Sequence, residues 1–300
     1  RLAAKLAALR VAEEMEEPVG KTVGYHFRSE SQSSPETRLR FYTEGILLRR
    51  MLSEPSLDSV AAVVLDEFHE RHFHADMALS LLRHLQKTKR PDLKIILMSA
   101  TLDQDKISRF LGDCPSFNLE IPAHPIEIIY QASTSREPLE KQVLQAFRDV
   151  LRKNSELLRS HNTLIFLPGR REIERTRTCF LDAGLDHEFE VLPLYGDLSK
   201  DQQNMVFQIQ KRPKIILSTN LAESSVTLPK IRCVIDSGLR KEADFSPWSG
   251  LPVLRTKPAT KASLIQRAGR SGRLGPGICF RLFSKLDFEG RPAFDNPEIT

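Results

Sequence analysis

The sequence lacks two features that are typical of secreted and membrane proteins. No apolar run approaches the length of a membrane span, and the first residues do not form a signal peptide. The few cysteines are far apart and form no CxxC motif: Cys114, Cys179, Cys233 and Cys279. This spacing favours reduced thiols over a disulfide framework. We therefore expect a cytoplasmic protein.

A phosphate-binding loop is also missing at the place where a short motif suggests one. The tripeptide GKT at 20–22 would need a glycine five residues before Gly20, but that position is Met15. GKT also follows a helical pattern at 2–16 and precedes a strand pattern, which is the reverse of the P-loop order. We therefore expect no P-loop at this site.

Length and composition indicate a globular protein of about two domains. The chain has 300 residues, of which 40% are hydrophobic and 28% are charged. Its net charge of +5 permits nucleic-acid binding but is weak evidence alone. It begins with Arg1 in a helical pattern and ends on PEIT without a closing signal. We expect it to be a piece of a longer protein.

Short apolar strands alternate with helical patterns along most of the chain. The strand patterns lie at 94–98, 163–167, 191–195, 214–218, 233–236 and 278–283, and the helical patterns lie at 76–87, 138–153, 171–182 and 199–210. This alternation predicts an α/β fold, with parallel sheets that carry helices on both faces. The region 118–138 lacks helical periodicity and contains three prolines, so we expect a domain boundary near residue 124.

The stretch Ala61–Arg71 (AAVVLDEFHER) contains a candidate catalytic site. Its apolar run at 61–65 predicts a buried central strand, and Asp66 and Glu67 follow at the carboxyl end, where α/β sheets bind ligands. One carboxylate there can hold Mg²⁺ while the next orients or deprotonates a water. A lone Asp–Glu pair is more often a solvated turn, so the rest of the chain has to decide. A zinc-protease motif is excluded because Phe73 replaces its second histidine.

Three further polar segments follow apolar strands. Ser99-Ala100-Thr101 could report the state of a phosphate, although an ST-turn that ends the strand is the simpler alternative. The run 218–227 offers six short polar groups that could bind phosphate or sugar oxygens, and it could also begin a capped helix. The loop 168–172 could place backbone N–H groups and a guanidinium on a phosphate.

Three arginines are interleaved with two glycines in QRAGRSGR at 266–273. Arg267, Arg270 and Arg273 are spaced by three and would share one face of a helix. Neighbouring guanidiniums repel one another unless an anion lies between them, and their forked donors suit phosphate oxygens. A solvated basic face is the alternative, but we favour a phosphate site.

Together, these segments resemble the DEAH-box helicases of superfamily two, which couple ATP hydrolysis to movement on RNA. The matching segments, in the order and spacing of that family, are RLAA (1–4), TEGIL (43–47), DEFH (66–69), SAT (99–101), FLPGRREIE (166–174), STNLAESSVTLP (218–229) and QRAGRSGR (266–273). Phe68 departs from the alanine in the family's name. DEFHER, VIDSGL at 234–239 and the final PEIT look most like the bacterial HrpB-type helicases.

The resemblance implies roles in ATP hydrolysis and in coupling. Asp66 would hold Mg²⁺, Glu67 would position the attacking water, and His69 would link the nucleotide site to the second domain. Ser99 and Thr101 would couple nucleotide state to nucleic-acid binding.

Further roles concern the two ligands, ATP and RNA. Gln266, Arg270 and Arg273 would reach the ATP phosphates, with the two arginines acting as fingers. The RNA backbone would be held, largely without sequence preference, by Arg1, Thr43, Gly45, Gly169, Arg170, Thr219 and Asn220.

The resemblance also implies two tandem RecA-like domains, at 1–123 and 124–290, with a β-hairpin at 241–258 and the start of a further region at 291–300. The family's P-loop would lie upstream of RLAA, so we expect these 300 residues alone to be inactive as an ATPase and the intact protein to be active. Two alternatives stay open: a catalytically silent nucleic-acid-binding protein of the same fold, and a DNA translocase of the same superfamily.

Overall fold

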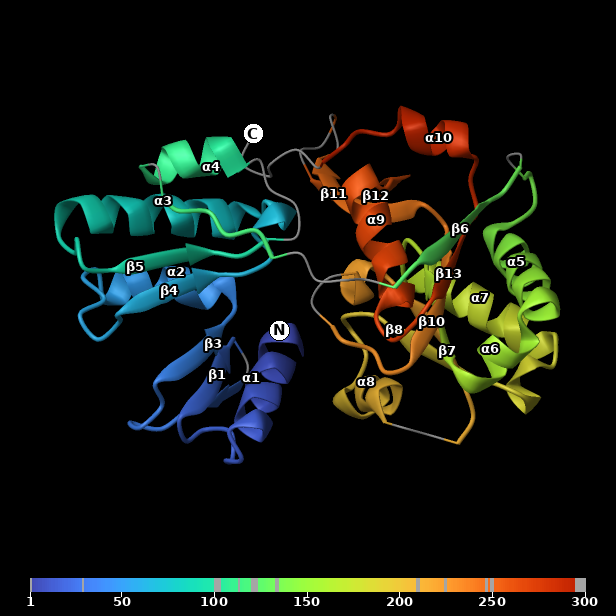
Figure 1. Ribbon diagram of the computed structural model, residues 1–300, viewed down its shortest axis with the longest axis horizontal. Coiled ribbons are helices and arrows are strands. Elements are labelled where there is room, and N and C mark those ends of the chain that lie inside the picture. Colours follow the sequence, from blue (N-terminus) through green and yellow to red (C-terminus); the bar gives the residue numbers. More distant parts are fainter. Residues whose placement is uncertain are drawn as a thin grey trace. The chain divides into compact units, whose positions relative to one another are not determined.

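The described part of the chain divides into two compact units, one within residues 1–119 and the other within residues 120–294 (Figure 1). The structure is a computed structural model that describes residues 2–28, 30–99, 104–112, 114–119, 124–132, 135–208, 211–223, 226–245, 248 and 251–294. Strands and helices alternate along the chain, and this confirms the predicted α/β class. Among the described residues, no helix combines the length and the apolar character that crossing a membrane requires.

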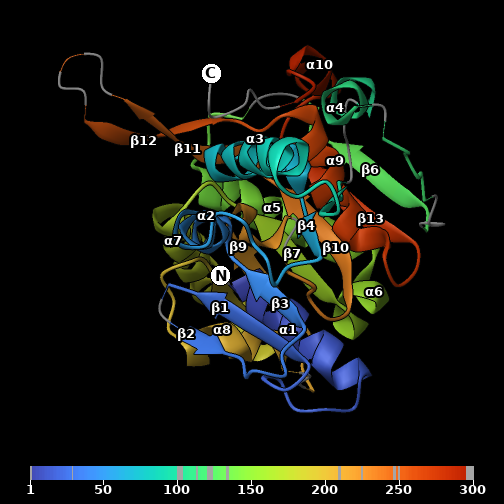
Figure 2. The same ribbon diagram turned by 90° about the vertical axis from the view of Figure 1, so that its left-hand side faces the viewer.

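The first unit begins with a helix packed on a small sheet. Helix α1 (Leu2–Glu14) lies against strands β1 (Val23–Phe27) and β3 (Leu39–Tyr42), as Figure 2 shows. Strand β2 (Glu30–Gln32) completes the sheet, whose order is β2-β1-β3. Small alanines of α1 allow the helix to approach the sheet closely, because they add little volume to the buried cluster of Ala8, Ala12, Val23, Tyr25 and Phe27.

The GKT tripeptide lies in the turn between α1 and β1, as predicted. Gly20 has a φ of +101°, in the left-handed region, and its N–H donates to the carbonyl of Val23. The backbone N–H and the hydroxyl of Thr22 both donate to the carboxylate of Glu17 at 3.1 Å. A carboxylate at this position repels phosphate, so the geometry confirms that GKT is not a P-loop.

The remainder of the first unit surrounds a parallel pair of strands, β4 and β5. Its elements are α2 (Glu44–Ser53), β4 (Ala62–Leu65), α3 (Phe73–Thr88), β5 (Lys94–Leu97) and α4 (Gln104–Leu111). The prediction that 61–65 forms a buried central strand is wrong for the described structure, where β4 pairs only with β5. Val63 and Leu65 are buried in one cluster with side chains of α2 and α3, whereas Val64 is 47% exposed. Alternate side chains of a strand point to opposite faces, and the helices cover only one of them.

The second unit contains a six-stranded, fully parallel sheet of order β6-β13-β10-β7-β9-β8. The strands are β6 (Ile126–Tyr130), β7 (Asn162–Phe166), β8 (Glu190–Leu194), β9 (Lys214–Ser218), β10 (Ile231–Asp236) and β13 (Gly277–Arg281). The helices are α5 (Leu139–Lys153), α6 (Ser155–Ser160), α7 (Arg170–Asp182), α8 (Lys200–Phe207), α9 (Lys261–Gly269) and α10 (Lys285–Gly290). Buried side chains of α5 and α7 form one core cluster with Ile165, Ile215 and Ile235 of the sheet.

An antiparallel hairpin leaves the sheet after β10. Its strands are β11 (Leu239–Phe245) and β12 (Pro252–Pro258), so the stretch 241–258 lies within it, with its tip partly outside the described residues. Gly238, at the base of the hairpin, has a φ of +69°. A Cβ there would lie 2.5 Å from the ring of Phe283, so only glycine fits without displacement.

Candidate functional site

Asp66 and Glu67 lie at the carboxyl end of β4, where the sequence places them. The Asp66 carboxylate is exposed, and its Oδ1 accepts from the N–H of Glu67 at 2.8 Å. Glu67 has a φ of +51°, and Arg71, on the other side of a 3₁₀ turn (Phe68–Glu70), also has a φ of +51°. Residues other than glycine rarely adopt this left-handed backbone conformation, and they keep it only where the surrounding contacts enforce it. The turn therefore presents both carboxylates in a defined geometry.

Phe68 anchors this turn to the core. Its side chain is 1% exposed, and its N–H donates to the carbonyl of Met98 at 3.1 Å. The guanidinium of Arg71 lies over the Phe68 ring at 5.6 Å and pairs with Asp76 in the first turn of α3 at 3.0 Å. Ser99 follows Met98 directly, so the structure brings the Asp66–Glu67 turn and Ser99 to the same edge of the sheet.

His69 stands beside the Glu67 carboxylate. Its Nδ1 is 3.5 Å from Oε2 of Glu67, and its side chain is only 9% exposed. A histidine so close to a carboxylate can orient it. The candidate RNA contacts of this unit lie at the start of α2, where Thr43 is the N-cap and Gly45 is exposed. Arg1 and Thr101 lie outside the described residues.

In the second unit, three loops gather at one edge of the parallel sheet. Phe166 pairs with Ser218 on one side and with Asp236 on the other, so the segments after β7, β9 and β10 emerge next to one another. The first segment carries Gly169 and Arg170, and the second carries Thr219 and Asn220. The structure therefore brings together the four candidate RNA contacts that the sequence places in this unit.

Each of these loops is held by local contacts. The Thr219 hydroxyl accepts from the N–H of Leu221 at 3.4 Å, at the start of a 3₁₀ turn. The guanidinium of Arg170 lies 5.6 Å from the centre of the Tyr195 ring. Burial, reinforced by a hydrogen bond to Glu174, raises the pKa of Tyr195, so that the phenol stays neutral beneath the guanidinium.

Lys241 is a candidate functional residue that the sequence analysis did not identify. It extends from β11 over Gly169, where a Cβ would lie 2.6 Å from its Nζ, and its ammonium pairs with Glu172 at 3.2 Å. A side chain at position 169 would therefore displace the end of the Lys241 side chain. The sequence around Lys241 could not predict this contact, because only the folded hairpin brings Lys241 to the loop that contains Gly169.

The prediction that Arg267, Arg270 and Arg273 share one face of a helix is wrong. Helix α9 ends at Gly269, and Arg270 begins a 3₁₀ turn. Arg267 is 1% exposed and pairs with two carboxylates of the protein, and Arg270 donates to backbone carbonyls. These carboxylates and carbonyls offset the repulsion between the guanidiniums of Arg267 and Arg270. Of the other two candidates, Gln266 is half-buried and Arg273 is exposed.

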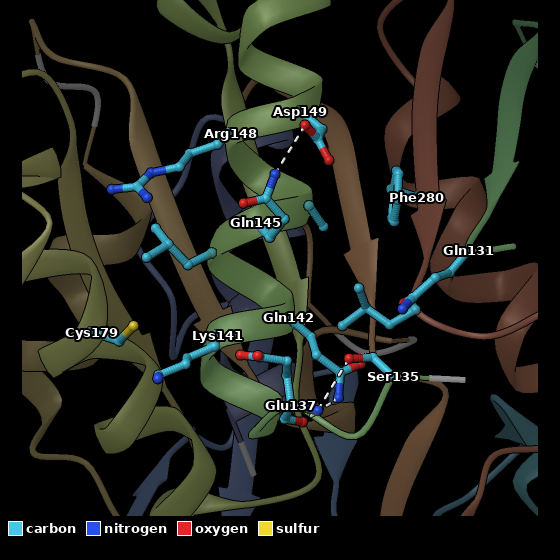
Figure 3. Close-up of a pocket in the computed structure, with 13 residues that line it drawn as sticks. Gln131, Ser135, Glu137, Lys141, Gln142, Gln145, Arg148, Asp149, Cys179 and Phe280 are labelled. Atoms are coloured by element: carbon cyan, nitrogen blue, oxygen red, sulfur yellow. Dashed lines mark hydrogen bonds between the residues drawn. The ribbon is translucent and has the colours of Figure 1, made fainter. Parts of the chain in front are cut away.

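A cavity of about 610 Å³ lies elsewhere in the second unit (Figure 3). It is bordered by α5 side chains such as Lys141 and Asp149 and by Phe280 of β13. None of the sequence-predicted site residues lines it. The candidate site residues therefore lie outside this cavity.

Comparison with known proteins agrees with these motifs. Residues 142–275 match the family profile described as "Helicase conserved C-terminal domain". The whole chain is 40% identical to ATP-dependent RNA helicase HrpB of Escherichia coli (strain K12) and covers 36% of that protein. It is 38% identical to ATP-dependent RNA helicase DHX33 of Mus musculus, of which it covers 44%.

A solved structure is similar along the whole chain. The crystal structure of the Escherichia coli DEAH/RHA helicase HrpB matches with a TM-score of 0.88 at 40% identity, over 100% of this chain and 38% of the other. The chain thus spans less than half the length of these relatives. In its motifs, in its fold and along its full length, the chain is similar to the HrpB-type DEAH-box helicases.

Proposed function

We propose that the protein carrying this chain is an ATP-dependent RNA helicase, and that the chain forms part of its motor. The observation that carries the proposal is the Asp66–Glu67 turn, held in a left-handed conformation by the buried Phe68. Relatives of the same type are named ATP-dependent RNA helicases. The segments that follow the strands of the second unit carry candidate residues that would bind the nucleic acid.

The two carboxylates suit different steps of phosphoryl transfer. Asp66 offers an exposed carboxylate, a ligand type that Mg²⁺ prefers, and Mg²⁺ would neutralise charge on the ATP phosphates. Glu67 would orient the attacking water and accept its proton, with His69 3.5 Å away to stabilise the carboxylate. Gln266, Arg270 and Arg273 would contact the phosphates.

RNA would be bound through its backbone. Gly169, Arg170, Thr219 and Asn220 offer backbone N–H groups, short polar side chains and one guanidinium, none of which requires a particular base. Binding should therefore be largely independent of sequence and should weaken with salt. Thr43 and Gly45 would hold a second part of the RNA strand.

A cytoplasmic location stays a prediction from the pattern of cysteines.

The test is ATP hydrolysis by the full-length protein with and without single-stranded RNA. Glu67→Gln should lower kcat by about 100-fold or more, because it removes the group that accepts the proton from water. Glu13→Gln is the matched control, since Glu13 forms an exposed ion pair with Arg10 and is not itself a candidate site residue. It should leave kcat unchanged.

The alternatives predict other outcomes of this test. Stimulation by DNA that equals or exceeds stimulation by RNA would favour a DNA translocase. Binding of RNA without any hydrolysis would favour a catalytically silent protein. A Glu67→Gln protein that hydrolyses ATP at the rate of the unmodified protein would refute the assigned mechanism.

A further inference from the structure

Arg267 is a buried charge that none of the assigned roles uses. Its Nε donates to the Glu223 carboxylate at 2.8 Å, and its Nη1 donates to the Asp236 carboxylate at 3.1 Å and to the carbonyl of Leu239 at 3.2 Å. The guanidinium also lies 5.0 Å from the centre of the Phe166 ring. One side chain of α9 thus joins the ends of β7 and β10, the start of β11 and the segment after β9.

Two carboxylates stabilise the buried guanidinium of Arg267. Burial of a guanidinium is costly unless opposite charges and hydrogen bonds offset it. Burial acts to lower the pKa of Arg267, but the Asp236 and Glu223 carboxylates outweigh it and the pKa is raised. Arg267 therefore remains charged.

The side chain of Arg270 binds the backbone of the same segment. Its Nε donates to the carbonyl of Glu223 at 2.7 Å, and its Nη1 donates to the carbonyl of Val226 at 2.7 Å. The side chain of Glu223 is thus held by one arginine and its carbonyl by the other. Both arginines come from the junction between α9 and the 3₁₀ turn that follows it.

Glu223 closes the turn that carries the candidate RNA contacts. Its N–H donates to the carbonyl of Asn220 at 2.9 Å, and residues 220–222 form a single 3₁₀ turn capped by Thr219. The hydrogen bonds therefore connect α9 and Arg270, through Glu223, to the turn that carries Thr219 and Asn220.

We propose that Glu223 is a positioning residue that couples nucleotide binding at the end of α9 to the RNA grip of Thr219 and Asn220, with Arg267 holding its carboxylate. The proposal rests on the proposed function, because it assigns ATP to Arg270 and RNA to this loop. Coupling of this kind is reciprocal: ATP changes RNA affinity by the same factor as RNA changes ATP affinity.

The experiment measures that factor in the full-length protein. The dissociation constant of a labelled single-stranded RNA oligonucleotide is determined with and without a non-hydrolysable ATP analogue and Mg²⁺. The ratio of the two constants is the coupling factor. Glu223→Gln keeps the shape of the side chain but removes its charge, and it should bring the coupling factor at least about fivefold closer to one.

A purely structural role for Glu223 predicts a different result. It would lower the melting temperature, and RNA affinity with and without the analogue would change by the same factor. The matched control is Glu188→Gln, which removes a carboxylate of the same unit from an exposed pair with Arg159 at 3.0 Å. That variant should keep the coupling factor of the unmodified protein.

A second variant covers the case in which Glu223→Gln does not fold. Arg267→Lys retains the buried positive charge, but one ammonium cannot span both carboxylates as the guanidinium does. It should lose coupling to a similar extent. A folded variant of either kind with an unchanged coupling factor would overturn the proposal.

Failure of this inference differs from failure of the proposed function. If the unmodified protein binds no RNA, the proposed function fails. If the unmodified protein binds RNA and shows coupling that Glu223→Gln preserves, only the positioning role of Glu223 fails.

Discussion

Phe68 packs in the core next to the Asp66–Glu67 turn, in the position where the family name has alanine. Phe68→Ala should lower the free energy of unfolding by about 3–5 kcal/mol, because it leaves a cavity beneath a strained turn. Chemical denaturation of the purified protein measures this change. Phe117 is 85% exposed, so Phe117→Ala should cost less than about 0.5 kcal/mol. Equal losses for the two variants would show that Phe68 does not anchor the turn.

The hairpin of β11 and β12 depends on one glycine for its exit from the sheet. Gly238→Ala should lower the free energy of unfolding by about 2 kcal/mol, since it combines a positive φ with a Cβ placed 2.5 Å from Phe283. Gly290→Ala is the matched control, because no atom lies within 4 Å of the added Cβ. Thermal unfolding compares them. A Gly238→Ala protein as stable as Gly290→Ala would mean that the base of the hairpin tolerates a different backbone.

For the molecule as a whole, ATP hydrolysis should require more than these 300 residues. They include candidate ligands for magnesium, water and phosphate, but their GKT tripeptide is bound to Glu17 and cannot cradle a phosphate. The isolated chain should therefore show a kcat/KM for ATP about 100-fold or more below that of the full-length protein. Measurement of phosphate release from both proteins tests this. RNA-stimulated release by the isolated chain that Glu67→Gln abolishes would contradict the prediction.

Much of the fold is determined by local sequence alone. Strand β9 lies at 214–218 as predicted, and β5 and β7 differ from their predicted limits by one residue. Alternating apolar strands and amphipathic helices specify a parallel sheet because each pattern buries one particular face. The strand-end rule likewise places Asp66–Glu67 and Thr219–Asn220 correctly at sheet edges. Both properties depend on residues that are adjacent in the chain.

The tertiary structure decided which charges are internal and which face solvent. Three arginines at equal spacing look equivalent in the sequence, but Arg267 finds carboxylates 31 and 44 positions away and is buried, whereas Arg273 is exposed. Val64 has the same local pattern as its buried neighbours, yet helices cover only the opposite face of its strand. Burial and pairing depend on segments that meet only after folding, so local spacing could not predict them.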